Sequence, residues 1–178
     1  MNIEKEYKTL INSANYQTMM DFYQVKARKQ VNYYFDTPEG LFNKNLNVRI
    51  RQIDDQYFFT LKHYQGQLYE YEFEISSLSI DDLNVQKLLT QFDIKNLKCI
   101  GSLTTYRAMI KDTYGELCID KNLYFDQVDY EVEYELSNAN EDHLDHFKNI
   151  LNQFNISFIG NKVSKSQRFQ NILKQTTQ

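Results

Sequence analysis

The N-terminal segment Glu4-Lys5-Glu6-Tyr7-Lys8 carries charged residues at alternate positions. Alternate side chains of a β-strand lie on one face, so Glu4, Glu6 and Lys8 are expected side by side. The two carboxylates would stand roughly 6–7 Å apart. Like charges this close repel each other. A bound cation would remove the repulsion, so the segment is a candidate metal site. A structural ion pair, with Lys8 neutralising Glu4 or Glu6, is the alternative.

Two further segments repeat this alternation of acids. Glu131-Val132-Glu133-Tyr134-Glu135 has a third acid in place of the lysine, and Glu70, Glu72 and Glu74 alternate with aromatic residues. Mg²⁺ commonly binds one or two carboxylates together with water and the phosphate oxygens of a substrate. The three acidic segments are therefore typical of a site that holds a divalent cation.

Basic residues occupy the corresponding positions of other predicted strands. Leu46, Val48 and Ile50 alternate with Asn47, Arg49 and Arg51, while Lys62 and Arg107 follow on later segments. Arginine binds phosphate oxygens in a bidentate manner, and acids near such an anion would repel it unless a metal stood between them. A polyphosphate with its metal explains both signs of charge.

The spacing of apolar residues predicts eight strands and four helices. The strands are expected at 2–10, 31–36, 46–53, 57–63, 68–75, 101–111, 116–123 and 128–136. The helices are expected at 16–24, from about 79 to 92, at 140–153 and at 164–174.

Strand after strand, one face is apolar and the other carries formal charges. An open antiparallel sheet with one wet face explains any single strand. Acids cluster on three strands and bases on others, which favours opposite clusters around an enclosed lumen. Eight antiparallel strands can close into a barrel that leaves no exposed edge. We therefore predict an α+β fold, a closed eight-stranded antiparallel β-barrel with flanking helices.

The 178 residues predict a single domain spanning residues 1–178, and 42% hydrophobic residues are typical of a globular protein. The net charge of −4 gives no reason to expect a specific nucleic-acid partner. The sequence shows no apolar run of membrane-spanning length and no secretory signal. Cys99 and Cys118 have no metal-ligand spacing and are expected to be buried thiols in a cytoplasmic protein.

The ordered series of motifs resembles the CYTH superfamily, the triphosphate tunnel metalloenzymes, over nearly the whole chain. The N-terminal Glu4-x-Glu6-x-Lys8 matches the ExExK hallmark of that family. The resemblance continues through Tyr34-Phe35-Asp36-Thr37, Asn47-Val48-Arg49-Ile50-Arg51, Thr60-Leu61-Lys62, Glu70 to Glu74, Tyr106-Arg107, Cys118-Ile119-Asp120, Tyr130 to Glu135 and Lys165-Ser166-Gln167-Arg168.

The resemblance implies a tunnel that binds a triphosphate with Mg²⁺ or Mn²⁺, and it implies a role for each matching position. Metal ligands would be Glu4, Glu6, Glu72, Glu74, Asp120, Glu131, Glu133 and Glu135. Phosphate ligands would be Lys8, Arg49, Arg51, Lys62, Arg107, Lys165 and Arg168. Catalytic roles would fall to Lys8, Arg51, Lys62 and Asp120. The acid that acts among Glu70, Glu72 and Glu74 stays open.

Three functions remain compatible with this pattern. A metal-dependent triphosphatase, acting on inorganic triphosphate or a nucleoside triphosphate, is the leading hypothesis. The alternatives are a class IV-type adenylate cyclase and a non-catalytic module that binds polyphosphate or a nucleotide. The expected partner is a small molecule containing a triphosphate, with no membrane; a monomer and a homodimer remain open.

Overall fold

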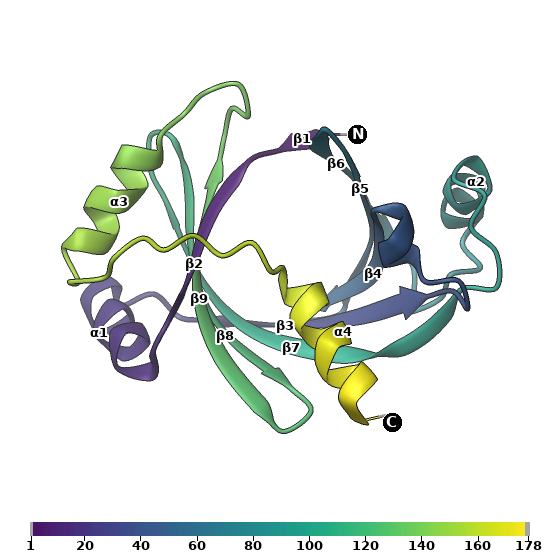
Figure 1. Cartoon of the computed structure of the whole chain (residues 1–178), viewed down its shortest axis with the longest axis horizontal. Helices are drawn as coiled ribbons and strands as arrows, with labels where there is room; N and C mark the ends of the chain where they lie inside the picture. The colour runs from purple at the N-terminus through teal and green to yellow at the C-terminus, as the bar shows by residue number, and fades with distance from the viewer. Residues whose placement is uncertain (1, 177–178) are drawn as a thin grey trace. The chain divides into compact units, whose positions relative to one another are not determined.

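The structure is a computed structural model that describes residues 2–176 (Figure 1). Within this range the chain forms nine β-strands, four α-helices and one short 3₁₀ helix. It divides into two compact units. Unit 1 contains the N-terminal residues through Ile3 together with Gln30–Leu103, and unit 2 contains Glu4–Lys29 together with the chain from Thr104 onward.

Unit 1 is built on five strands and the beginning of a sixth. In hydrogen-bonded order they are β1, β6, β5, β4, β3 and β7, and the registers from β3 to β6 are antiparallel. The bounds are β1 (Asn2–Glu4), β3 (Arg28–Asp36), η1 (Leu41–Lys44), β4 (Leu46–Ile53), β5 (Gln56–Gln65), β6 (Gln67–Ile75), α2 (Leu83–Gln91) and β7 (Lys98–Lys111).

The apolar residues of unit 1 lie on one face of this sheet. Val48 and Ile50 of β4 and Phe59 of β5 are fully buried. They belong to one cluster with the apolar side of α2, whose first turn is capped by Asp82 accepting from the backbone N–H groups of Asn84 and Val85. The period of two along each strand therefore leaves the opposite face to Arg49, Arg51 and the other charged residues.

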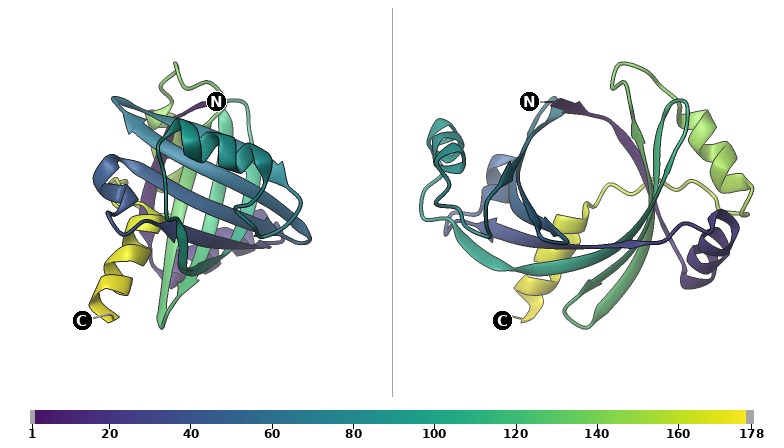
Figure 2. Two further views of the ribbon diagram at one scale, coloured as in Figure 1. Left: turned by 90° about the vertical axis from the view of Figure 1, so that its right-hand side faces the viewer. Right: turned by 180° about the vertical axis from the view of Figure 1, so that it is seen from behind.

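Unit 2 continues from β7 into β8, β9 and β2, again with antiparallel registers. The bounds are β2 (Glu6–Ile11), α1 (Ser13–Tyr23), β8 (Gly115–Tyr124), β9 (Gln127–Leu136), α3 (Leu144–Asn152) and α4 (Lys165–Thr176). Helices α1 and α3 lie along the same side of β2, β8 and β9 (Figures 1 and 2).

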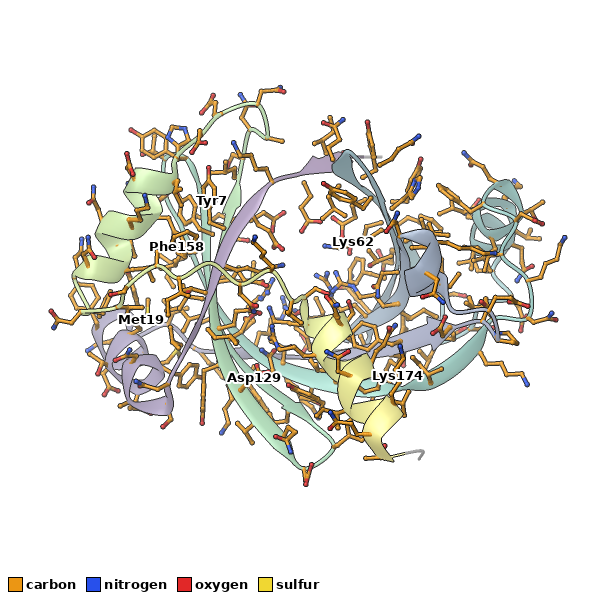
Figure 3. All side chains as sticks on the ribbon, in the orientation of Figure 1. Tyr7, Met19, Lys62, Asp129, Phe158 and Lys174 are labelled. Carbon is orange, nitrogen blue, oxygen red and sulfur yellow. The ribbon has the colours of Figure 1, made fainter. Side chains whose placement is uncertain are left out.

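The core of unit 2 fills the space between these helices and the strands. Met19 of α1, Phe147 of α3 and Val132 of β9 are fully buried in one cluster, and Tyr7 and Phe158 pack at its margin (Figure 3). Because alternate residues of β8 and β9 enter this core, Asp120, Glu131 and Glu133 face the other way. The helices thereby fix which face of unit 2 is charged.

The structure corrects several details of the predicted elements. The first predicted strand is two strands, because β1 pairs with β6 whereas β2, beyond Lys5, pairs with β9. This division makes nine strands where eight were predicted. The third helix begins at Leu144 rather than at 140. Cys118 is buried as expected, but Cys99 is exposed because it lies near the start of β7.

None of the helices within residues 2–176 is long and apolar enough to cross a membrane.

Candidate active site

The charged face of unit 2 is set by strand register. Asp120 of β8 lies opposite Arg107 of β7 on one side and Glu131 of β9 on the other. Two residues beyond Glu131 on the same face of β9, Glu133 lies opposite Lys8 of β2. Residues that face each other across antiparallel strands project from the same face, so the register alone brings three acids and two bases together.

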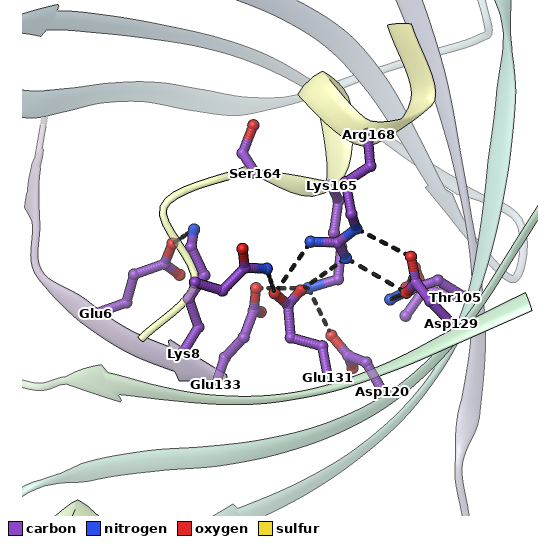
Figure 4. A network of polar contacts seen from close by, with 12 residues as sticks. Glu6, Lys8, Thr105, Asp120, Asp129, Glu131, Glu133, Ser164, Lys165 and Arg168 are labelled. Atoms are coloured by element: carbon purple, nitrogen blue, oxygen red, sulfur yellow. Dashed lines mark hydrogen bonds and ion pairs between the residues drawn. The ribbon is translucent and has the colours of Figure 1, made fainter. Parts of the chain in front are cut away.

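Lys165, the first residue of α4, extends into this group of acids (Figure 4). Its ammonium Nζ lies 2.9 Å from Asp120, 2.7 Å from Glu131 and 2.5 Å from Glu133. The side chains of Asp120 and Glu131 are 0% exposed and that of Lys165 is 13% exposed. Carboxylates so deeply buried require a partner of opposite charge, and Lys165 supplies it.

Arg107 closes the same group from β7. It donates from Nε and NH2 to the two carboxylate oxygens of Asp120, at 2.8 and 2.6 Å, and from NH2 to Glu133. This is the bidentate geometry in which guanidinium and carboxylate interact most strongly. Arg107, predicted as a phosphate ligand, is thus bound to acids of its own chain.

Charged neighbours shift the pKa of Glu133 and of Lys165. Burial disfavours the charged form of Glu133, but the positive charges of Lys165 and Arg107 outweigh it and hold the pKa well below its ordinary value. Burial likewise opposes the charge on Lys165, and Asp120 and Glu133 keep its pKa well above the ordinary value. Glu133 and Lys165 are therefore both ionised near neutral pH.

Cys118 lies opposite Glu133 on the same face, directly beside the ionised group. Burial is the main cause that raises the pKa of its thiol to about 12. The thiol stays protonated near neutral pH, so it is not a nucleophile here.

Arg168, the second predicted phosphate ligand of α4, is held by acids on β9 (Figure 4). Nε and NH2 donate to Asp129 at 2.9 and 3.3 Å, and NH1 and NH2 donate to Glu131 at 3.2 and 3.1 Å. NH1 also donates to the backbone carbonyl of Val163 at 2.9 Å. These five contacts equal the five N–H donors of a guanidinium, so Arg168 is fully engaged by the protein.

At the N-terminal motif, the structure places Lys8 against Glu6 with Nζ 2.5 Å from the carboxylate. This is the ion pair that the sequence left open as an alternative. Glu4 ends β1 and Glu6 begins β2, on either side of Lys5. Glu135 is exposed and lies opposite Glu6 and Glu116, so it does not join the buried acids around Lys165.

Strand register also sets the charged face of unit 1. Lys62 lies opposite Asn47 and Glu70, while Thr60 lies between Arg49 and Glu72. Arg51 lies opposite Phe58, whose other neighbour is Glu74. The structure thereby gathers Arg49, Arg51 and Lys62 on one face, as predicted.

Contacts within the unit 1 face are longer than those in unit 2. Arg51 NH2 is 3.4 Å from Glu72, and Arg49 NH2 is 3.8 Å from Glu70 and 3.9 Å from Glu72. Charge-assisted hydrogen bonds measure about 2.7–2.9 Å. The Nε atoms of Arg49 and Arg51 are buried and have no hydrogen-bond partner among the described residues. These donors fit an anion that the protein itself does not supply.

The three candidate acids of β6 differ in their surroundings. Glu70 faces Lys62 at 3.5 Å and Glu72 accepts a hydrogen bond from Thr60 at 2.9 Å. Glu74 is exposed and accepts from Gln56 at 3.3 Å. Glu70 and Glu72 therefore lie among the cations, while Glu74 is more peripheral.

Sequence reasoning missed three polar members of these faces. Asn32 lies opposite Arg51, is 3% exposed, and its buried Oδ1 has no hydrogen-bond partner among the described residues. Asp129 continues the alternation of Glu131 and Glu133, a signal the sequence did contain. Asn161 donates to Glu131 at 2.8 Å and its backbone N–H donates to the carbonyl of Lys8, contacts that no sequence pattern indicates.

A family model described as the CYTH domain matches residues 2–169. The chain belongs to the CYTH domain family. A Bacillus subtilis protein named "Putative triphosphatase YjbK" is 29% identical over 168 residues, covering 86% of this chain and 87% of that protein. The prediction made from the ExExK motif and the later motifs is therefore confirmed.

Solved structures of other proteins resemble the chain over most of its length. A Bacillus halodurans crystal structure described as a "putative adenylate cyclase" has a TM-score of 0.83 and 30% identity, covering 94% of this chain and 97% of that one. A Hippeastrum protein, HpAC1, described with a dominant triphosphatase activity, has a TM-score of 0.77 at 20% identity and covers 96% of each chain. The predicted fold class, antiparallel with flanking helices, is confirmed.

The acids of the unit 2 face fit the divalent metal that the CYTH family implies. Carboxylate oxygens are the ligands that Mg²⁺ and Mn²⁺ prefer, and three of them already converge on one cation, the Lys165 ammonium. Within residues 2–176, no group of three or more acidic, histidine or cysteine side chains is arranged to hold a metal directly. The carboxylate oxygens are thus suitable metal ligands, and in this structure they contact the Lys165 ammonium instead.

Proposed function

We propose that this CYTH protein hydrolyses a triphosphate, inorganic triphosphate or a nucleoside triphosphate, with Mg²⁺ or Mn²⁺ as cofactor. The observation that carries the proposal is the unit 1 face, where the buried Nε atoms of Arg49 and Arg51 have no acceptor among the described residues. Relatives named as triphosphatases support the same reaction.

The residues of unit 1 would bind the phosphate oxygens. Arg49 and Arg51 are consecutive residues on the charged face of β4, and Lys62 lies on the same face of the neighbouring strand. Together they would neutralise an anion of high charge and hold it in one orientation, which is the main contribution proteins make to phosphoryl transfer. Glu70 and Glu72 would keep the three cations in place between turnovers.

The residues of unit 2 would hold the metal and position water. Glu4, Glu6, Asp120, Glu131 and Glu133 are the proposed ligands in this unit. When bound, the metal supplies charge neutralisation and an activated water. Asp120, held by two hydrogen bonds from Arg107, would orient the attacking water, and Lys8 would contact the phosphate after leaving Glu6.

A second reaction uses the same groups. In adenylate cyclase chemistry the ribose hydroxyl, rather than water, attacks the α-phosphorus, and the Bacillus halodurans structure bears that description. Both reactions need cationic phosphate ligands and a metal, so the products distinguish them.

The test is a panel of tripolyphosphate and nucleoside triphosphates with Mg²⁺ or Mn²⁺, in which orthophosphate, pyrophosphate and cyclic nucleotide are measured together. Wild type should release orthophosphate, and replacing both Glu4 and Glu6 with alanine should abolish the metal-dependent release while the protein stays folded. Glu39→Ala, which removes an exposed acid outside both faces, is the matched control. Cyclic AMP without orthophosphate would indicate the cyclase, and undiminished turnover in the double variant would reject the proposed metal ligands.

A further inference from the structure

The two cations of α4 are bound in different ways. The five N–H donors of Arg168 all contact Asp129, Glu131 or a backbone carbonyl, which anchors the helix to β9. Lys165, one turn earlier, contacts the acids only through the ammonium at the end of its long, flexible side chain. Lys165 can therefore change partners while the helix stays in place.

The resting partners of Lys165 are the acids proposed to hold the metal. Asp120, Glu131 and Glu133 surround its Nζ at 2.5–2.9 Å, and an ammonium has three N–H donors for them. Lys165 is itself a proposed phosphate ligand. The same ammonium cannot neutralise these acids and bind a phosphate at once, so the proposed function requires it to leave.

The charge of the group favours a divalent ion over the lysine. Three carboxylates face two side-chain cations, Lys165 and Arg107, which leaves one negative charge in excess. Asp129 with Arg168, and Glu6 with Lys8 opposite Glu133, each add one charge of each sign and do not change the excess. Exchange of the ammonium for a divalent cation would cancel it.

The position of Lys165 in α4 also favours an anion as its second partner. Ser164 caps the helix, since its Oγ accepts from the backbone N–H of Gln167. Lys165 is therefore at the end where the helix dipole is positive, a place unfavourable for a cation and favourable for a phosphate. The acids hold Lys165 there against the dipole.

We propose that the Lys165 ammonium neutralises Asp120, Glu131 and Glu133 until a divalent metal displaces it. The released ammonium then binds the triphosphate. This inference rests on the proposed function and adds an order to it. Lys165 must leave before the phosphate can use it, so metal binding prepares the phosphate site.

The first test measures metal binding without turnover. Mg²⁺ or Mn²⁺ alone is titrated by calorimetry into wild type, Lys165→Met and Lys165→Arg. The methionine variant lacks the competing charge and should bind metal at least about tenfold more tightly, whereas the arginine variant should bind it no more tightly than wild type. Whereas metal affinity should rise in Lys165→Met, hydrolysis should become less efficient, with a higher KM for tripolyphosphate. A merely structural lysine would weaken both properties.

The second test uses wild type, so it does not depend on a variant that folds. An amine-reactive acylating reagent is applied with and without Mg²⁺, and the labelled lysines are identified by mass spectrometry. Labelling of Lys165 should rise with metal, while labelling of the exposed Lys162 should not. No metal binding by wild type and Lys165→Met, or metal binding that leaves Lys165 unreactive, would overturn the proposal. Release of Lys165 in a protein without triphosphatase activity would support it and reject only the proposed reaction.

Discussion

The two charged faces contain the same kinds of residues but hold them differently. In unit 2 the Lys165 ammonium lies 2.5–2.9 Å from three acids, two of which are 0% exposed. In unit 1 the described contacts of Arg49 and Arg51 with acids measure 3.4–3.9 Å, and Glu72 is 34% exposed. The acids of unit 2 are neutralised by Lys165 and Arg107. In unit 1, the buried Nε atoms of Arg49 and Arg51 have no acceptor among the described residues. Under the proposed function, the first face would exchange its lysine for a metal and the second would bind the anion.

The largest difference between the faces should appear in stability. Glu131→Gln keeps the shape of the side chain but leaves Lys165 and Arg168 short of a buried partner, so the free energy of unfolding should fall by about 3–5 kcal/mol. Glu72→Gln removes a half-exposed acid of unit 1 and should lower it by no more than about 1 kcal/mol. Urea denaturation followed by circular dichroism measures both. Equal losses would show that the contrast in burial has no energetic consequence.

Replacing an arginine of unit 1 should have a smaller effect, on ligand affinity rather than on stability. Arg51→Ala removes a buried Nε donor that has no acceptor among the described residues, so tripolyphosphate measured by calorimetry should bind about 10- to 100-fold more weakly. The free energy of unfolding should change by less than about 1 kcal/mol. Lys95→Ala, in an exposed ion pair of the same unit, is the matched control. Unchanged affinity in Arg51→Ala would remove the basis for a phosphate site on this face.

The smallest expected effect is a dependence of the unfolding free energy on pH, caused by Glu133 of unit 2. Folding lowers the pKa of Glu133 well below its ordinary value of 4.5, so its carboxylate stabilises the fold above that pH. This contribution is lost as the pH falls from 4.5 toward the folded pKa. The difference in unfolding free energy between wild type and Glu133→Gln should be constant near neutral pH and shrink below about pH 4.5. A difference that persists undiminished at about pH 3 would contradict the assigned charge state.

Much of this arrangement could be predicted from alternation along the strands. Arg49 and Arg51 flank Ile50, and Glu131 and Glu133 flank Val132, so a period of two separates charge from core before any contact is known. The division of the first strand at Lys5 could not be predicted, because a change of pairing partner leaves the alternation intact. The exposure of Cys99 depends on its place near the start of β7, which composition does not indicate.

By itself, the sequence determined the family, the antiparallel strands and the charged positions along each strand, since these follow from residue types at fixed spacing. Only the tertiary structure decided that α4 brings Lys165 and Arg168 onto the acids of β8 and β9, and that Asn32 joins the arginines of unit 1. The physical reason is that a strand's period fixes the direction of its own side chains. The contact of Lys165 with Glu133 joins residues 32 positions apart in the chain, and the period of a strand gives no information on such a contact.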